Sequence, residues 1–256
     1  MLRTLWTSKS GMMATQEKLD SISNNVVNSG TTGYKRVEVG FKDLLTETLD
    51  RNGVPLNDKS TVIGTGSKTG EWYRDVSQGT LLESSINSNM AIDGEGFFRV
   101  TEANGEVSYS RDGSFTVDSI GRIVNSEGNL LEVQYENGYS AENINLTTNN
   151  MLVDTSGNLF VKNSDTFTKV GEIHLYTAVG DRAFLAKGDN LYYPNEGVEV
   201  YRTTNAEIYQ GLVEGSNVDI ATEFTDMIMT QRAFELSSKG ITTADEMWQL
   251  VNNMRS

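Results

Sequence analysis

The N-terminal end of the chain carries hydrophobic residues at a helical spacing. Between residues 4 and 27, five of them form one stripe, four at strict seven-residue steps: Leu5, Met12, Leu19, Ile22 and Val26. A strict seven-residue repeat keeps one side of a helix facing a partner, which is typical of supercoiled helices. Asn28-Ser29-Gly30 then supplies residues suited to a helix C-terminus. The pattern predicts one long helix that ends near residue 28.

The C-terminal end repeats the seven-residue step more clearly. The repeat consists of Ile220, Met227, Phe234, Ile241 and Trp248. Ser216-Asn217-Val218-Asp219 precedes it and has the composition of a capping box. Gly240 costs about 1 kcal/mol relative to alanine inside a helix, but the repeat stays in phase across it. We therefore predict one long helix here rather than two.

The middle of the chain, between about residues 70 and 209, shows short β-favouring runs instead. Phe97-Phe98-Arg99-Val100 and Asn158-Leu159-Phe160-Val161 are examples. Turns of one kind separate such runs, with Asp or Asn in the first position and glycine in the fourth, at residues 118–121, 125–128 and 154–157. These features predict an antiparallel sheet.

Together the patterns predict an α+β protein, with long N- and C-terminal helices pairing as a coiled coil and a mainly antiparallel β-domain inserted between them. The expected segments are an N-terminal helix at 1–34, an extended loop or arm at 35–69, a β-rich domain at 70–209 and a C-terminal helix at 210–256. The arm is polar between residues 46 and 67 and contains Asn52-Gly53 and Pro55.

The two stripes fit either an ordinary intramolecular helical hairpin or an interface between chains. Fully burying one large apolar side chain stabilises by roughly 1.5–3 kcal/mol, whereas ordering the backbone costs about 1–2 kcal/mol per residue. An isolated two-helix seam is therefore marginal. We expect both stripes, and thus all ten residues named in them, to form an assembly interface completed by neighbouring chains.

The composition of the chain argues against several classes of function and site. The 256-residue chain has a formal net charge of -14, so general binding to nucleic acid is not expected. It has no cysteine, which excludes disulfides, thiolate chemistry and cysteine-ligated metals. The N-terminus lacks the apolar run of a signal peptide, and no window is apolar enough to span a membrane.

Candidate catalytic or metal-binding residues are few. His174, the single histidine, lies in an alternating run and is expected on a strand surface. Asp93-Gly94-Glu95-Gly96 lacks the ligand spacing of a calcium loop and is expected to be a tight turn. Gly33-Tyr34-Lys35-Arg36 is expected to be a solvated basic turn. We expect no catalytic, cofactor-binding or metal-binding site.

The motifs resemble those of the flagellar rod and hook proteins, in the family's order and across nearly the whole chain. They comprise residues 19–28 with Thr32-Gly33-Tyr34-Lys35 at the N-terminal end, residues 78–81, 91–98 and 111–115 in the middle, and residues 210–219, 227–228, 231–235 and 243–247 at the C-terminal end. Phe234 stands where the family usually has tyrosine. Among the members, the resemblance is strongest to the distal rod protein.

The resemblance implies a structural subunit of the bacterial flagellar basal body that self-assembles into a helical tube, transmits torque and encloses the export channel. It implies export by the flagellar type III apparatus without a cleaved signal, and contacts with other rod and hook proteins. Neither a cofactor nor a membrane-inserted segment is implied.

Three alternatives remain. A proximal rod or hook-type axial protein would share these motifs. A secreted β-rich enzyme would need a catalytic cluster, and a fibre or adhesin subunit could share terminal coiled-coil helices.

Overall fold

In a computed structural model, the described residues are 2–44, 46–48, 62–64, 66–163, 166–180, 183–188 and 190–254. The chain forms two compact units. The helical unit comprises Met1–Val27, Arg36–Asp75 and Val218–Ser256, and the β-unit comprises Asn28–Lys35 and Val76–Asn217.

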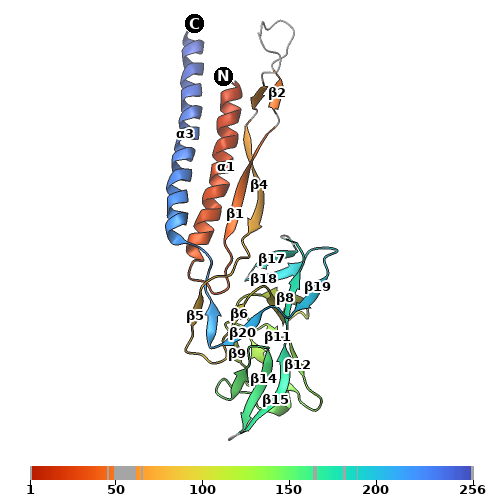
Figure 1. Ribbon diagram of the computed structural model, residues 1–256. Coiled ribbons are helices and arrows are strands. Elements are labelled where there is room, and N and C mark those ends of the chain that lie inside the picture. The colour runs from red at the N-terminus through yellow and green to blue at the C-terminus, as the bar shows by residue number, and fades with distance from the viewer. Residues whose placement is uncertain are drawn as a thin grey trace. The chain divides into compact units, whose positions relative to one another are not determined.

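The helical unit contains two long helices and a strand pair. These elements are α1 (Leu2–Val27), β1 (Val37–Asp43), β4 (Ser67–Arg74) and α3 (Ile220–Asn253), with the short strands β2 (Thr46–Thr48) and β3 (Val62–Gly64). The β1–β4 and β2–β3 pairs are antiparallel. Within this unit, α1 lies between α3 and the β1–β4 pair and packs against both (Figure 1).

The structure agrees with the predicted end of the first helix and the predicted start of the second. Helix α1 ends at Val27, directly before the predicted stop signal. Asp219 caps α3 by accepting a hydrogen bond from the Ala221 backbone N–H at 2.9 Å. A hydrogen bond from the Thr222 hydroxyl is the main cause that lowers the Asp219 pKa below its ordinary value. Helix α3 runs unbroken through Gly240, as the in-phase repeat predicted.

The β-unit consists of antiparallel sheets. Seven strands of a nine-stranded sheet follow the order β17 (Phe184–Gly188), β18 (Leu191–Pro194), β8 (Val107–Ser110), β7 (Phe97–Thr101), β11 (Leu130–Leu131), β10 (Ile123–Val124) and β9 (Thr116–Val117). The other two strands branch from this order: β16 (Leu175–Ala178) pairs with β7, and β19 (Val200–Thr203) pairs with β16. A four-stranded sheet has the order β12 (Val133–Tyr135), β15 (Thr166–Ile173), β14 (Asn158–Asn163) and β13 (Met151–Val153).

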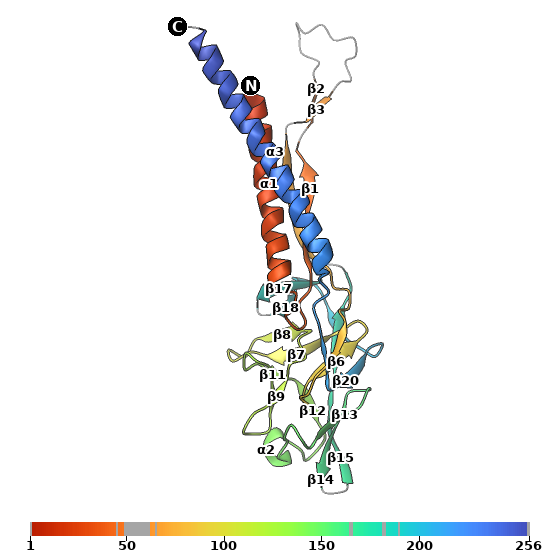
Figure 2. The same cartoon turned by 90° about the vertical axis from the view of Figure 1, so that its left-hand side faces the viewer.

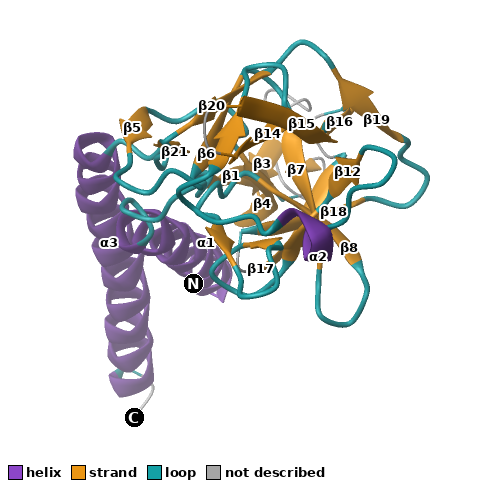
Figure 3. Ribbon diagram, turned by 90° about the horizontal axis from the view of Figure 1, so that it is seen from below, coloured by secondary structure: helices purple, strands orange, loops and turns teal. Residues whose placement is uncertain are grey.

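Two further strand pairs complete this unit. They are β20 (Glu207–Gln210) with β6 (Met90–Asp93), and β21 (Leu212–Glu214) with β5 (Leu81–Glu83). Among the described residues, the only other helix is the short α2 (Ala141–Ile144), drawn in purple in Figure 3.

A contiguous apolar core holds the sheets of the β-unit together. Met90, Phe98, Phe115 and Leu159 are fully buried in it, and the rings of Phe98 and Phe115 meet edge to face at 5.2 Å. The predicted turn at residues 154–157 ends in Gly157, which has a φ of 83°. A Cβ there would also lie 2.3 Å from the Ile173 carbonyl oxygen, so only glycine fits.

The strand pairings explain where the two units divide. Strands β1 and β4 pack on α1, so residues 36–75 belong with the helices. Strands β20 and β21 pair with β6 and β5, so residues 207–214 belong with the β-unit. The expected boundaries at 35–69 and 210–256 lie elsewhere, because composition alone does not reveal these long-range pairs. The middle of the expected arm, residues 49–61, lies outside the described residues.

His174 connects the two larger sheets of the β-unit. It lies between β15 of one sheet and β16 of the other, and only 12% of its side chain is exposed. Arg202 in β19 is 2.5 Å from Nδ1, which must accept because guanidinium only donates. Nε2 lies 2.8 Å from the amide oxygen of Gln134 in β12 and 3.8 Å from the Glu172 carboxylate. Burial, and secondly Arg202, lower the His174 pKa.

The stability of the β-unit should therefore depend on His174 in mild acid. As the pH falls through 6.5, the ordinary pKa of histidine, the unfolded chain takes up a proton that the folded chain resists. The β-unit should therefore lose stability as the pH falls below about 6.5 and keep its full stability at higher pH. In His174→Asn, whose side-chain oxygen can still accept from Arg202, the slope of unfolding free energy against pH should flatten. An identical slope in both proteins, measured by urea unfolding, would contradict this role.

Candidate assembly surface

Small residues form the contact between α1 and α3. A Cβ on Gly11 would lie 3.3 Å from the Ser237 Oγ, and one on Gly240 would lie 2.5 Å from the Ser8 Oγ. The step from Ser8 to Gly11 along α1 corresponds to the step from Gly240 back to Ser237 along α3. The two helices are therefore antiparallel (Figures 1 and 2). Small side chains allow the two helix backbones to approach closely. Gly240 is therefore a packing residue, which explains a glycine inside a long helix.

This small-residue seam follows its own seven-residue steps. Its members in the two helices are Ser8, Thr15, Thr230, Ser237 and Ala244, with Gly11 and Gly240 between them. Thr15, Thr230 and Ala244 are buried. The sequence prediction missed this series because it followed only large hydrophobic residues.

The predicted interface residues lie beside this seam rather than filling it. Ile22 is buried. Seven others are partly buried: Leu5, Met12, Leu19, Val26, Met227, Phe234 and Ile241. Ile220 and Trp248 are exposed, at 47% and 44%. The helix pair therefore leaves much of both predicted stripes accessible.

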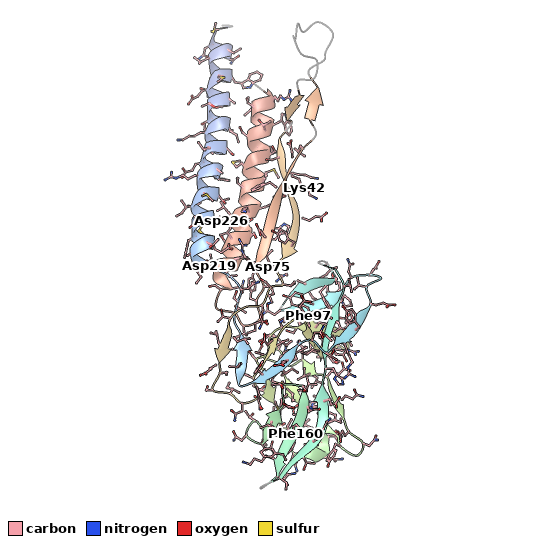
Figure 4. All side chains as sticks on the ribbon, viewed as in Figure 1. Lys42, Asp75, Phe97, Phe160, Asp219 and Asp226 are labelled. Carbon is pink, nitrogen blue, oxygen red and sulfur yellow. The ribbon has the colours of Figure 1, made fainter. Side chains whose placement is uncertain are left out.

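Helix α3 also presents a second apolar surface to solvent. Of its 34 described residues, only Glu223, Thr230 and Ala244 are buried. Exposed apolar residues on one side, called the outer stripe, are Met229, Leu236, Met247, Leu250 and Met254. Their spacings of three, four, seven and eleven residues place them on one helix face. Figure 4 shows that side chains project from α3 along its length.

A buried polar cluster fixes the register of the helical unit. The Asn25 amide of α1 exchanges hydrogen bonds with the backbone N–H and carbonyl of Val37 in β1, both at 2.9 Å. It also donates to Glu223 of α3 at 3.2 Å. Arg36 donates to the same carboxylate at 2.6 Å. Burial lowers the Arg36 pKa, but Glu223 outweighs this and raises it above the ordinary value.

A second buried cluster lies in the β-unit and corrects the expectation of a solvated basic turn. The side chains of Lys35 and Glu214 are both fully buried and 2.6 Å apart. Arg111 contacts the other carboxylate oxygen at 3.2 Å. The Gly79 backbone N–H donates to Glu214, and Lys35 donates to the Ser77 carbonyl. Every oxygen of this carboxylate thus has a cationic partner, as a buried charge requires.

The other candidate residues are those that could hold a metal ion and those of the predicted tight turn. Among the described residues, no group of three or more His, Asp or Glu side chains is placed to hold a metal. Asp93 precedes a bend at Gly94, whose φ is 108°. In the described part of the chain, neither long helix is apolar enough over its length to cross a membrane.

Removing the buried carboxylate should destabilise the β-unit strongly. Glu214→Gln leaves Lys35 and Arg111 without their anion, and breaking a buried pair in this way costs about 3–5 kcal/mol. The matched control is Glu132→Gln, because Glu132 pairs with Arg99 where both side chains are partly exposed. The control should change the unfolding free energy by roughly 1 kcal/mol or less. Equal losses of unfolding free energy in the two variants, measured by urea unfolding, would contradict a special role for the buried carboxylate of Glu214.

Asn25→Asp should loosen the helical unit. The variant keeps the shape of the side chain but replaces the donor to Val37 and Glu223 with a second carboxylate facing Glu223. A lost hydrogen bond and an unfavourable charge contact together cost about 2–4 kcal/mol. Hydrogen exchange should accelerate in α1 and β1. Asn252→Asp, at an exposed site on α3, should leave exchange unchanged; acceleration in that control as well would argue against a specific cluster.

Three family models match this chain. "Flagella basal body rod protein" matches residues 5–35, which include most of α1. "Flagellar hook protein FlgE/F/G D1 domain" matches residues 91–161 in the β-unit. "Flagellar basal body rod FlgEFG protein C-terminal" matches residues 209–254, which include α3.

Full-length relatives agree with these matches. The chain is 35% identical to the flagellar basal-body rod protein FlgG of Agrobacterium fabrum, over 98% of each chain. It is 32% identical to FlgG of Borreliella burgdorferi, over 100% of this chain and 99% of the relative. It is also 32% identical to FlgG of Bacillus subtilis, over the full length of both. The chain belongs to the flagellar basal-body rod protein family and is similar along its whole length to the distal rod protein FlgG.

Proposed function

We propose that this chain is a non-enzymatic subunit that assembles with its own copies into the helical tube of the rod. The observation that carries the proposal is the exposure of apolar side chains on α3, where Leu236 and Leu250 are 68% and 64% exposed. Contiguous exposed apolar surface on a folded chain marks an interaction site. Copies of the same chain, arranged around a common axis, would cover it.

The assembly interface would combine the predicted stripes with the outer stripe. Leu5, Met12, Leu19 and Val26 would contribute surface from α1, and the buried Ile22 would support them from within the helical unit. Ile220, Met227, Phe234, Ile241 and Trp248 would contribute from α3. The surfaces differ, so contacts between copies would be heterologous and would not close, which gives an open helical assembly.

Torque transmission and enclosure of the export channel follow from this proposal. A tube held by many repeated side-chain contacts resists twisting, and its lumen leaves a passage for exported proteins. Other rod and hook proteins would contact its two ends, since family members share these helices. We infer that the chain reaches the flagellar basal body through the type III export apparatus without removal of a signal peptide.

A charge in the outer stripe should block assembly without unfolding the chain. Leu236→Lys places an ammonium group at a 68% exposed position, so it should change the folded monomer little. Buried between copies, the same charge would be unpaired and strongly unfavourable. Cells carrying only this variant should lose motility and lack complete basal bodies in electron micrographs.

The matched control for this test is Glu235→Lys on the same helix. Glu235 is exposed and pairs with Arg232, outside the outer stripe. This variant should retain motility. Normal motility of Leu236→Lys, at normal protein level, would reject the outer stripe as an assembly contact.

A further inference from the structure

All sulfur in this chain is methionine sulfur. The sequence has nine methionines and no cysteine. Any sulfur-based response to oxidants must therefore use thioether groups, which oxidise to sulfoxides. Six of the nine lie in or at the ends of the two long helices: Met12, Met13, Met227, Met229, Met247 and Met254.

The two units differ sharply in how accessible these thioethers are. In the β-unit, Met90 and Met151 are 0% and 4% exposed. In α3, Met229 and Met247 are 61% and 53% exposed. Because access to the sulfur limits its oxidation, a peroxide should modify the helical unit while the β-unit core stays intact.

Met229 and Met247 lie in the helical part of the outer stripe, whereas Met254 is the C-cap residue just beyond α3. Met229 is seven residues from Leu236, and Met247 is three residues from Leu250, so each shares a helix face with an exposed leucine. A thioether contributes apolar contact and adapts to varied neighbours. A sulfoxide at the same place adds a polar oxygen to a surface that would be dry after assembly.

We propose that Met229 and Met247 are oxidation sites through which a peroxide arrests assembly of the unassembled chain. This rests on the proposed function, because arrest requires the outer stripe to be an interface between copies. In the reaction, a sulfur lone pair attacks one peroxide oxygen, a sulfur–oxygen bond forms, and the O–O bond breaks. The hydroxide that leaves takes the proton from the new S–OH group. The sulfur loses two electrons and gains one oxygen atom, and hydrogen peroxide is reduced to water.

The modification itself is tested on the purified full-length chain with dilute hydrogen peroxide. Peptide mass spectrometry should show oxygen gain at Met229 and Met247 well before Met90 and Met151. Circular dichroism should stay unchanged, and methionine sulfoxide reductase should reverse the gain. Oxidation of Met90 as fast as that of Met229 would overturn the site assignment, whatever the chain's function.

The consequence is tested by substitution in cells that lack their own copy. The double variant Met229→Gln and Met247→Gln carries polar side chains of similar length, in place of sulfoxides. It should give about tenfold fewer basal bodies per cell, because unpaired polar groups weaken each repeated contact. The double variant Met229→Leu and Met247→Leu should assemble normally. After peroxide treatment before assembly it should lose less assembly than the unchanged chain, because Met254 is then the last thioether of the outer stripe.

The outcomes separate the two proposals. Equal basal-body numbers in the Gln and Leu variants would overturn the arrest by oxidation. Failure of both would also overturn it, because the leucine variant keeps the apolar surface. If Leu236→Lys assembles normally, the proposed function of the outer stripe fails, and the oxidation map still decides whether the thioethers are selective targets.

Discussion

The close antiparallel contact of α1 with α3 is the constraint on which the helical unit depends. Glycine and serine meet where a coiled coil of large residues would place leucine, as at Gly11 with Ser237 and Gly240 with Ser8. Backbones this close leave no room between them for large side chains. The large apolar residues of both helices are therefore displaced to the flanks and the outer faces. The packing inside one chain thus determines which apolar side chains this chain exposes.

A seam of small residues buries little apolar area, so other interactions must set its register. Asn25 and Glu223 supply this, because they lie opposite one another in the same antiparallel register as the serine and glycine pairs. Arg36 is drawn to Glu223, while its neighbour Lys35 contacts Glu214. Arg36 thus pairs with a carboxylate of the helical unit, and the adjacent Lys35 pairs with a carboxylate of the β-unit. Buried ion pairs add little net stability, but leaving one of the charges buried without its partner is costly. The pairs therefore disfavour packings in which these charges are separated.

The sequence predicted the parts of this fold that depend on local pattern. The seven-residue repeats predicted both helices and the continuity of α3 through Gly240. The stop signal after Val27 and the capping residues up to Asp219 predicted where α1 ends and α3 begins. The Asp/Asn-to-glycine turns predicted an antiparallel middle. Each of these follows from interactions between residues close in sequence.

Long-range partners could not be predicted in the same way. Lys35 is read as a solvated residue until Glu214, 179 residues further along, is known to lie beside it. Likewise, β1 was included in an arm because its partner β4 and the side of α1 that covers it are separate in sequence. The small-residue seam was overlooked because serine, threonine and glycine at helical spacing are common on exposed helices. Their role in packing can be recognised only from the close approach of Gly11 to Ser237 and of Gly240 to Ser8 in the structure.

The charge of the chain adds a condition on how such subunits would meet. A net charge of -14 repels identical copies at long range, although salt screens this beyond about 8 Å under physiological conditions. The attraction of the outer stripe acts only at contact, since it arises from removal of water from apolar surface. Two free copies therefore meet a barrier before they gain contact energy. In the proposed assembly, a growing end that offers several apolar surfaces at once would overcome this barrier more readily than one free copy would, which would favour ordered addition to an existing tube.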